Sequence, residues 1–135
     1  GASVEMQSRH GGMTALLWAA SQGHEGVVKA LLRAVARHEA QDEGGRGALH
    51  YAASRGYLTI VRELLAAGAS IDATSSLNVT ALQMASERGH ADVVQALCSA
   101  GAALELQLDS AGLTAIHAGA AMGHLDVVRA LLTGT

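Results

Sequence analysis

Phenylalanine and proline are absent from this 135-residue chain, cysteine occurs once, and aromatic residues amount to 2% of the sequence. Without proline or a Gly-X-Y period the chain cannot be a collagen, and a hydrophobic fraction of 50% with a net charge of −3 is not that of a disordered polymer. The sequence has instead 28 alanines and 16 glycines. Because alanine buries little surface, we expect closely packed helices rather than a thick globular core.

The single cysteine, Cys98, cannot form an internal disulfide, which favours an intracellular protein, cytoplasmic or nuclear. Residues 1–15 lack the charged segment and apolar core of a signal peptide, and residues 1–3 are typical of a cloning remnant. No apolar run reaches the ~18 residues that a membrane-spanning helix needs. The nine Lys and Arg residues are scattered and the isoelectric point is near 6.1, so we expect neither nucleic acid binding nor membrane insertion.

Four segments of the chain align with one another, at residues 14–24, 47–57, 80–90 and 114–124. In each segment the residue before the last one is a glycine. Gly23, Gly56 and Gly89 are 33 residues apart, and Gly123 follows after 34. Behind each glycine comes a segment with apolar pairs four residues apart, such as Val-Val-x-x-Leu-Leu at residues 27–32. This spacing marks one face of a helix. Each unit is therefore predicted to contain a short Ala-rich helix, a turn and a second, amphipathic helix.

The period and the Thr-Ala-Leu motifs that open the first and third units resemble the ankyrin repeat, a family with a period of about 33 residues and a Thr-Pro-Leu-His-x-Ala signature. The resemblance implies an all-α solenoid of stacked helix-turn-helix units joined by β-hairpin-like fingers. It divides the chain into an N-terminal extension at 1–8, repeats at 9–41, 42–74 and 75–108, and a truncated fourth repeat at 109–135. The sequence departs from the family where the signature has proline, at Ala15, Ala48, Ala81 and Ala115.

The ends of the first helices carry recognisable signals. Thr14, Thr80 and Thr114 are predicted to cap these helices through their hydroxyls, a role that Gly47 cannot fill in the second unit. The recurring glycines are predicted to end the same helices in the left-handed conformation. Gly119 lies inside the first helix of the fourth unit and is expected to weaken it by about 1 kcal/mol. In the first unit, residues 35–36 replace the Gly-Ala of the family, which predicts an irregular connector.

Seven histidines raise the question of a metal site, but most of them recur at equivalent positions. His24, His90 and His124 share one repeat position, and His50 and His117 share another. Recurrence at structural positions favours imidazoles that bridge backbone groups between loops or repeats. We therefore expect no metal.

Other residues give no sign of catalysis either. Cys98 stands where the other units have leucine, so it is predicted to be a small buried hydrophobe. The glycine-rich stretch 43–47 lacks the strand and the Lys-Ser/Thr of a phosphate loop. Acidic residues, Asp42 among them, are expected to be spread over finger and solvent-facing positions, without the pairing that acid–base catalysis needs. The sequence predicts no enzymatic activity and no cofactor.

The resemblance implies that a protein or peptide partner binds along the fingers and the exposed edge of the first helices. The predicted contact residues occupy variable positions of those segments: His10, Met13, Trp18, Gln22, Glu43, Arg46, Tyr51, Arg55, Leu77, Val79, Arg88, Leu113 and Met122. Aromatic and arginine side chains are enriched in interface hot spots, which favours Trp18, Tyr51, Arg46 and Arg55. For the two aromatic residues, packing against the adjacent repeat is the alternative.

The function expected from these observations is a protein–protein interaction scaffold that binds its partner on a concave surface formed by fingers and first helices. One alternative is a regulatory or substrate-docking domain that is part of a larger enzyme. Another is a structural module that associates with itself through the apolar fourth repeat, where Val127, Val128, Leu131 and Leu132 lack a polar cap. The apolar finger residues Leu77, Val79 and Leu113 favour the first, since exposed apolar clusters usually mark interaction sites.

Overall fold

The computed structural model describes residues 14–34, 41–77, 79–102 and 114–133, and all the regular secondary structure within these ranges is helical. The helices form four successive pairs, each with a first and a second helix. Their bounds are α1 (Ala15–Gln22) and α2 (Glu25–Arg33), α3 (Ala48–Arg55) and α4 (Leu58–Ala66), α5 (Ala81–Arg88) and α6 (Ala91–Ser99), and α7 (Ala115–Ala121) and α8 (Leu125–Thr133).

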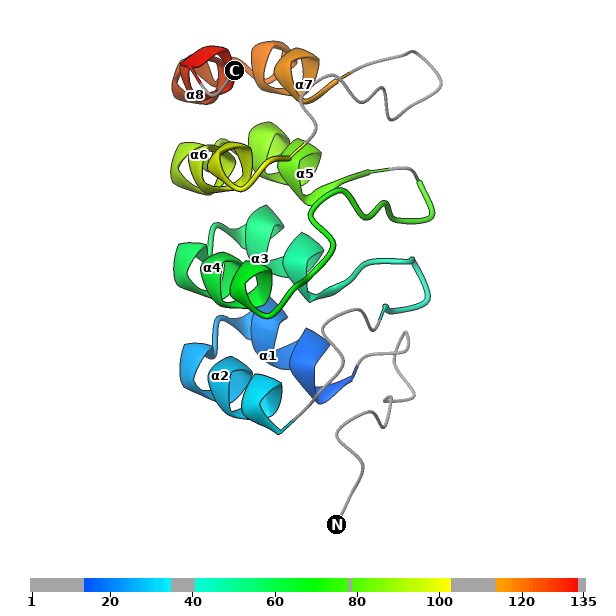
Figure 1. Ribbon diagram of the computed structural model, residues 1–135. Coiled ribbons are helices and arrows are strands. Elements are labelled where there is room, and N and C mark those ends of the chain that lie inside the picture. The colour runs from blue at the N-terminus through cyan, green and yellow to red at the C-terminus, as the bar shows by residue number, and fades with distance from the viewer. Residues whose placement is uncertain (1–13, 35–40, 78, 103–113, 134–135) are drawn as a thin grey trace.

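The pairs stack in chain order, and the stack has two layers (Figure 1). The first helices α1, α3, α5 and α7 contact one another in sequence, and α2, α4, α6 and α8 form a second column beside them. The described parts of the connectors before α3 and α5 project from the side of the first helices (Figure 1). The predicted all-α repeat solenoid is confirmed.

Small residues allow the first helices to pack closely. Ala52 and Ala53 of α3 are fully buried, as are Ala20 and Ala85 at related positions of α1 and α5. Larger side chains of the core come from both layers, for example Leu17 of α1 and Leu64 of α4. The core is therefore thin and continuous along the stack, as the alanine content predicts.

The helix starts follow the sequence signals in part. The Thr14 and Thr80 hydroxyls each accept a hydrogen bond from a backbone N–H three residues on, at 3.2 Å. At Thr114 the prediction is wrong, because its hydroxyl lies 2.9 Å from Nδ1 of His117. The same ring nitrogen accepts from the Thr114 backbone N–H, which is the contact that the third helical residue makes in a capping box.

The predicted glycine turns are confirmed at Gly23, Gly56 and Gly89, each of which ends a first helix with φ between 78° and 80°. Space as well as conformation requires glycine at Gly56: a Cβ there would lie 2.6 Å from Nδ1 of His90. The ring of the next pair thus sits directly on the turn of the preceding pair. The fourth turn differs, because Met122 is the cap of α7 and the left-handed Gly123 follows it.

Gly119 has a packing role that its sequence position does not reveal. A Cβ at this residue would lie 2.9 Å from Cγ1 of Val127, which is fully buried in α8. The missing side chain lets α7 and α8 approach each other, so the expectation that this glycine only weakens its helix is incomplete. The predicted irregular connector at residues 35–36 lies outside the described residues.

Candidate functional site

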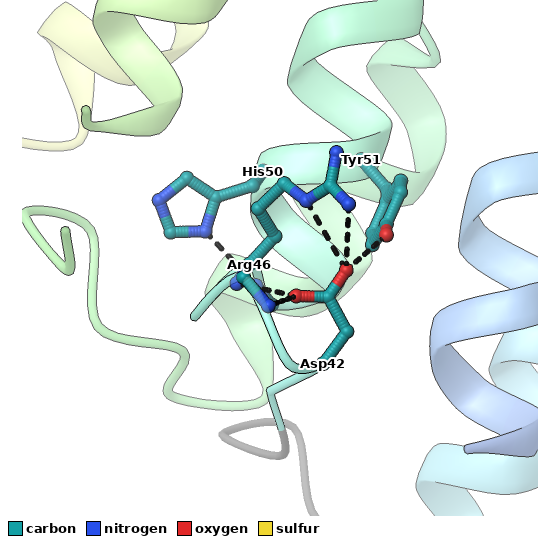
Figure 2. A network of polar contacts seen from close by, with 6 residues as sticks. Asp42, Arg46, His50 and Tyr51 are labelled. Atoms are coloured by element: carbon teal, nitrogen blue, oxygen red, sulfur yellow. Dashed lines mark hydrogen bonds and ion pairs between the residues drawn. The ribbon is translucent and has the colours of Figure 1, made fainter. Parts of the chain in front are cut away.

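The connector before α3 is organised around one buried carboxylate. The side chain of Asp42 is only 2% exposed and accepts hydrogen bonds at Oδ1 from the backbone N–H groups of Gly44 and Arg46, both at 2.9 Å. At Oδ2 it receives the Tyr51 hydroxyl as well as Nε and Nη2 of Arg46, each 3.1 Å away (Figure 2). Asp42 lies on the connector, where a finger residue was predicted, and its burial there is possible because local backbone donors and two side chains satisfy the carboxylate.

This arrangement shifts the titration of both acids in the network. Burial opposes the ionisation of Asp42, but the hydrogen bonds from Tyr51 and Arg46 and the nearby guanidinium outweigh it, so the pKa of Asp42 lies below its ordinary value. Burial and the hydrogen bond to the carboxylate raise the pKa of Tyr51. The network is therefore ionised at Asp42 and protonated at Tyr51 around neutral pH.

Arg46 also lies over the Tyr51 ring, with its guanidinium carbon 5.2 Å from the ring centroid. Both residues are predicted partner contacts, and the structure brings them together. Their polar groups are engaged with Asp42, and Tyr51 is partly buried, whereas about half of the Arg46 side chain is exposed. Within this network they hold the connector and the start of α3 in one geometry.

His50, one residue before Tyr51, joins this connector to the next one. Its Nδ1 accepts from the Gly47 backbone N–H at 3.0 Å, so its Nε2 carries the proton and donates to the Val79 carbonyl, also at 3.0 Å. The side chain is buried, and burial lowers the pKa of His50. This contact confirms for His50 the prediction that the recurring histidines bridge backbone groups between loops.

A groove of about 340 Å³ opens beside this network, between α3 and α5. Its walls combine a partly apolar floor, three cations and a single acid: Arg46, His50, Tyr51, Ser54, Arg55, Val79, Met84, Glu87 and Arg88. Five of these residues, Arg46, Tyr51, Arg55, Val79 and Arg88, are predicted partner contacts. Arg55 and Arg88 are the last residues of α3 and α5 and are exposed.

The other predicted contacts lie away from this groove. Trp18 is 58% exposed, so packing between repeats does not account for it, and Leu77 on the connector before α5 is 81% exposed. Gln22, Glu43 and Met122 are exposed as well. His10, Met13 and Leu113 lie outside the described residues.

Two further recurring histidines, His90 and His124, also bridge backbone groups between pairs, as predicted, whereas His117 contacts Thr114 of its own pair. Nε2 of His90 lies 3.0 Å from the Ser54 carbonyl, and Nε2 of His124 lies 3.0 Å from the Glu87 carbonyl. In the described part of the chain no three His, Cys, Asp or Glu side chains are grouped so that they could hold a metal ion. Cys98 is half-buried rather than fully buried, and burial raises the pKa of its thiol.

A second depression, of about 620 Å³, lies on the opposite layer between α4 and α6. Its lining includes Leu58, Arg62 and Leu65 and none of the predicted contact residues. None of the helices in the described ranges has the length and apolar character required to cross a membrane.

Comparison with known proteins identifies a family. The family model described as "Ankyrin repeats (3 copies)" matches residues 1–75 and again residues 72–135. A search of curated proteins finds no match to the chain.

Proposed function

The chain belongs to the ankyrin-repeat family, and from this premise we propose that it is a binding module that holds a partner protein in the groove between α3 and α5. Ankyrin repeats are generally protein–protein interaction modules. The first helices form one face of the repeat stack, and the groove on this face is lined by five of the predicted contact residues. Enzymatic activity is not part of the proposal.

The observation that carries the proposal is the combination of a fixed scaffold with unused binding groups. Asp42 and His50 fix the connectors on both sides of the groove, so little ordering remains to be done when a partner binds. Arg55 and Arg88 meanwhile form no ion pair or hydrogen bond among the described residues. Exposed arginines beside a tyrosine are typical of interface hot spots.

Affinity capture from cell extract tests this assignment. The double variant Arg55→Glu/Arg88→Glu changes the groove, and Arg33→Glu/Arg62→Glu makes the same change in charge on exposed residues of the second helices. We expect proteins retained by the unmodified chain and by the Arg33/Arg62 variant to be lost from the groove variant. Circular dichroism establishes that all three are equally helical. Equal retention by the groove variant, or no retained protein at all, contradicts the proposal.

Self-association is a second candidate, supported by the surface of α8. The apolar residues predicted to lack a cover are partly buried: Val127 and Leu131 lie in the core, whereas Leu132 and also Leu125 are each 60% exposed. Leu125 and Leu132 are two turns apart and so share one face of the helix. A sedimentation mass that rises with concentration, and that Leu125→Lys abolishes, would support this role.

A further inference from the structure

We propose that the partner segment in the groove between α3 and α5 is an extended acidic peptide whose carboxylates are three residues apart. This inference rests on the proposed function and adds the chemistry of the partner. Its basis is the position and the pairing of the three arginines that line the groove, Arg46, Arg55 and Arg88.

The groove is locally cationic on a chain whose net charge is −3. Arg46 is compensated by Asp42, to which it donates from both Nε and Nη2. Arg55 and Arg88 have no compensating carboxylate, and the only acid in the lining, Glu87, accepts from Nε2 of Gln83 at 3.2 Å. Two uncompensated guanidinium groups and one carboxylate therefore line the groove.

The positions of Arg55 and Arg88 at helix ends explain why these residues are cations, but not why their N–H donors face the groove unpaired. A cation at the C-terminal end of a helix is favoured by the helix dipole, and Arg55 and Arg88 are the last residues of α3 and α5. That interaction does not use the planar fork of N–H donors, which suits a carboxylate bound through two parallel hydrogen bonds. The free donors thus match the side chain of a glutamate or aspartate.

The spacing of the arginines selects the peptide conformation. Arg55 and Arg88 occupy equivalent positions of two packed helices, whose axes are typically about 8–10 Å apart. A polyproline II segment rises about 3.1 Å per residue and returns to the same face every third residue, which places residues i and i+3 about 9 Å apart. The intervening residues then lie over Tyr51 and Met84, which accept an apolar side chain. The fitting sequence is Glu-x-x-Glu with one apolar residue inside.

A nucleic acid fits the same surface less well. Phosphate backbones require a basic stripe that neutralises several successive charges. Here Glu87 interrupts the cations, and Asp42 already compensates Arg46. The charges suit two separated carboxylates better than a continuous row of phosphates.

The probe is the peptide Gly-Ser-Glu-Leu-Pro-Glu-Ser-Gly, in which proline favours the polyproline II conformation. Titrated into the 15N-labelled chain, it is expected to shift the side-chain Nε–Hε signals of Arg55 and Arg88 and the amide of Met84. The peptide with glutamine in place of both glutamates should bind about tenfold more weakly, since each lost charge weakens a charge-assisted hydrogen bond. Affinity for the acidic peptide should also fall as salt is raised.

Matched variants locate the binding. Arg55→Gln/Arg88→Gln should weaken the acidic peptide about tenfold, and Arg33→Gln/Arg62→Gln should leave it unchanged. Absence of site-specific shifts up to about 5 mM peptide, where even a millimolar Kd is visible, overturns the proposal. Equal binding of the glutamine peptide, or full binding by the Arg55/Arg88 variant, overturns it as well.

A single-stranded oligonucleotide serves as the competing ligand. If it binds more tightly than the acidic peptide and displaces it, the groove recognises phosphates and the proposal is wrong. The capture experiment separates this failure from failure of the proposed function. If a protein partner is lost only from the groove variant and the acidic peptide does not bind, the inference that the partner segment is acidic is wrong, but the proposed binding module stands. If the Arg55/Arg88 variant retains the partner as well as the unmodified chain does, both the proposed function and the acidic-peptide inference are wrong.

Discussion

Among individual residues, Asp42 has the largest number of dependent partners. Its carboxylate receives backbone donors from the connector, a guanidinium and the Tyr51 hydroxyl, so its loss leaves several donors unsatisfied at once. We expect Asp42→Ala to lower the free energy of unfolding by about 2–3 kcal/mol. Urea denaturation followed by circular dichroism measures it. Glu43→Ala, at an exposed neighbour, should change stability by less than about 0.5 kcal/mol; equal effects of the two variants would contradict the role of the network.

The buried imidazole of His50 makes stability depend on pH. Its pKa in the folded chain is below the ordinary value of 6.5, so as the pH falls through 6.5 the unfolded chain binds a proton that the folded chain does not. The contribution of this group to the free energy of unfolding has its full value above pH 6.5. Below pH 6.5 the contribution decreases, by at most about 1.4 kcal/mol per pH unit.

Urea midpoints of the wild type and of His50→Gln, compared at about pH 7.5 and about pH 5.5, test this dependence. The variant should be less stable at the higher pH, because it loses the bridge to Val79, and should lose less stability on acidification. An identical loss in the two proteins would show that other groups govern the acid sensitivity.

The sequence predicted the roles of these residues where the role depends on residue type, and failed where it depends on contacts with residues distant in the chain. Arg46, Tyr51 and Arg55 were expected at a binding surface because of their residue types, and all three line the groove. The burial of Asp42 could not be seen in the repeat alignment, because it depends on a hydroxyl nine positions away and on the turn of the connector. The Asp-Glu-Gly-Gly stretch at residues 42–45 is typical of a turn, and it is the local signal that the sequence contains.

At the scale of single elements, the turns that join the paired helices are tied to the neighbouring pair. Gly56 combines a left-handed backbone with contact to the His90 ring, so an alanine there suffers both backbone strain and overlap. We expect Gly56→Ala to cost about 2–4 kcal/mol. Gly26→Ala is the control: no atom lies within 4 Å of the added Cβ inside α2, so it should stabilise the chain by about 0.5–1 kcal/mol.

Thermal and urea unfolding of the two glycine variants give both changes in one series. If Gly56→Ala were tolerated as well as Gly26→Ala, the ring contact would not constrain the turn.

The presence and the ends of the helices were largely predictable from the repeat, because caps and apolar spacing are local properties. The exceptions, Thr114 and Gly119, depend on His117 and Val127, whose side-chain positions no local rule specifies.

For the whole molecule, the stack of pairs predicts uneven local stability. Within the described residues α3, α4, α5 and α6 contact pairs on both sides, whereas α1, α2, α7 and α8 contact a pair on one side only. Val27 of α2 is 51% exposed, although Ile60 and Val93 at the equivalent positions are buried. Amides of the central helices should therefore exchange with deuterium at least about tenfold more slowly than those of the outer ones.

Hydrogen exchange with mass spectrometric readout resolves the four pairs. Uniform protection along the chain would instead indicate unfolding as one cooperative unit.

The repeat boundaries at 41/42, 74/75 and 108/109 stay predictions, since the period defines a repeat only up to a shift of its starting point. The intracellular setting also stays a prediction.

The placement of a ring from each pair on the glycine of the pair before it bears on how this chain can change in evolution. Duplication or loss of a whole repeat leaves every remaining glycine opposite a ring, because each junction repeats the last. A single residue inserted between such a ring and the glycine just before it in the chain, or within the helix that follows the ring, would instead change the register, because one added helical residue turns the following side chains by about 100° and moves the apolar stripe away from the core. Length variation should accordingly proceed by whole repeats, or by residues added in the connectors.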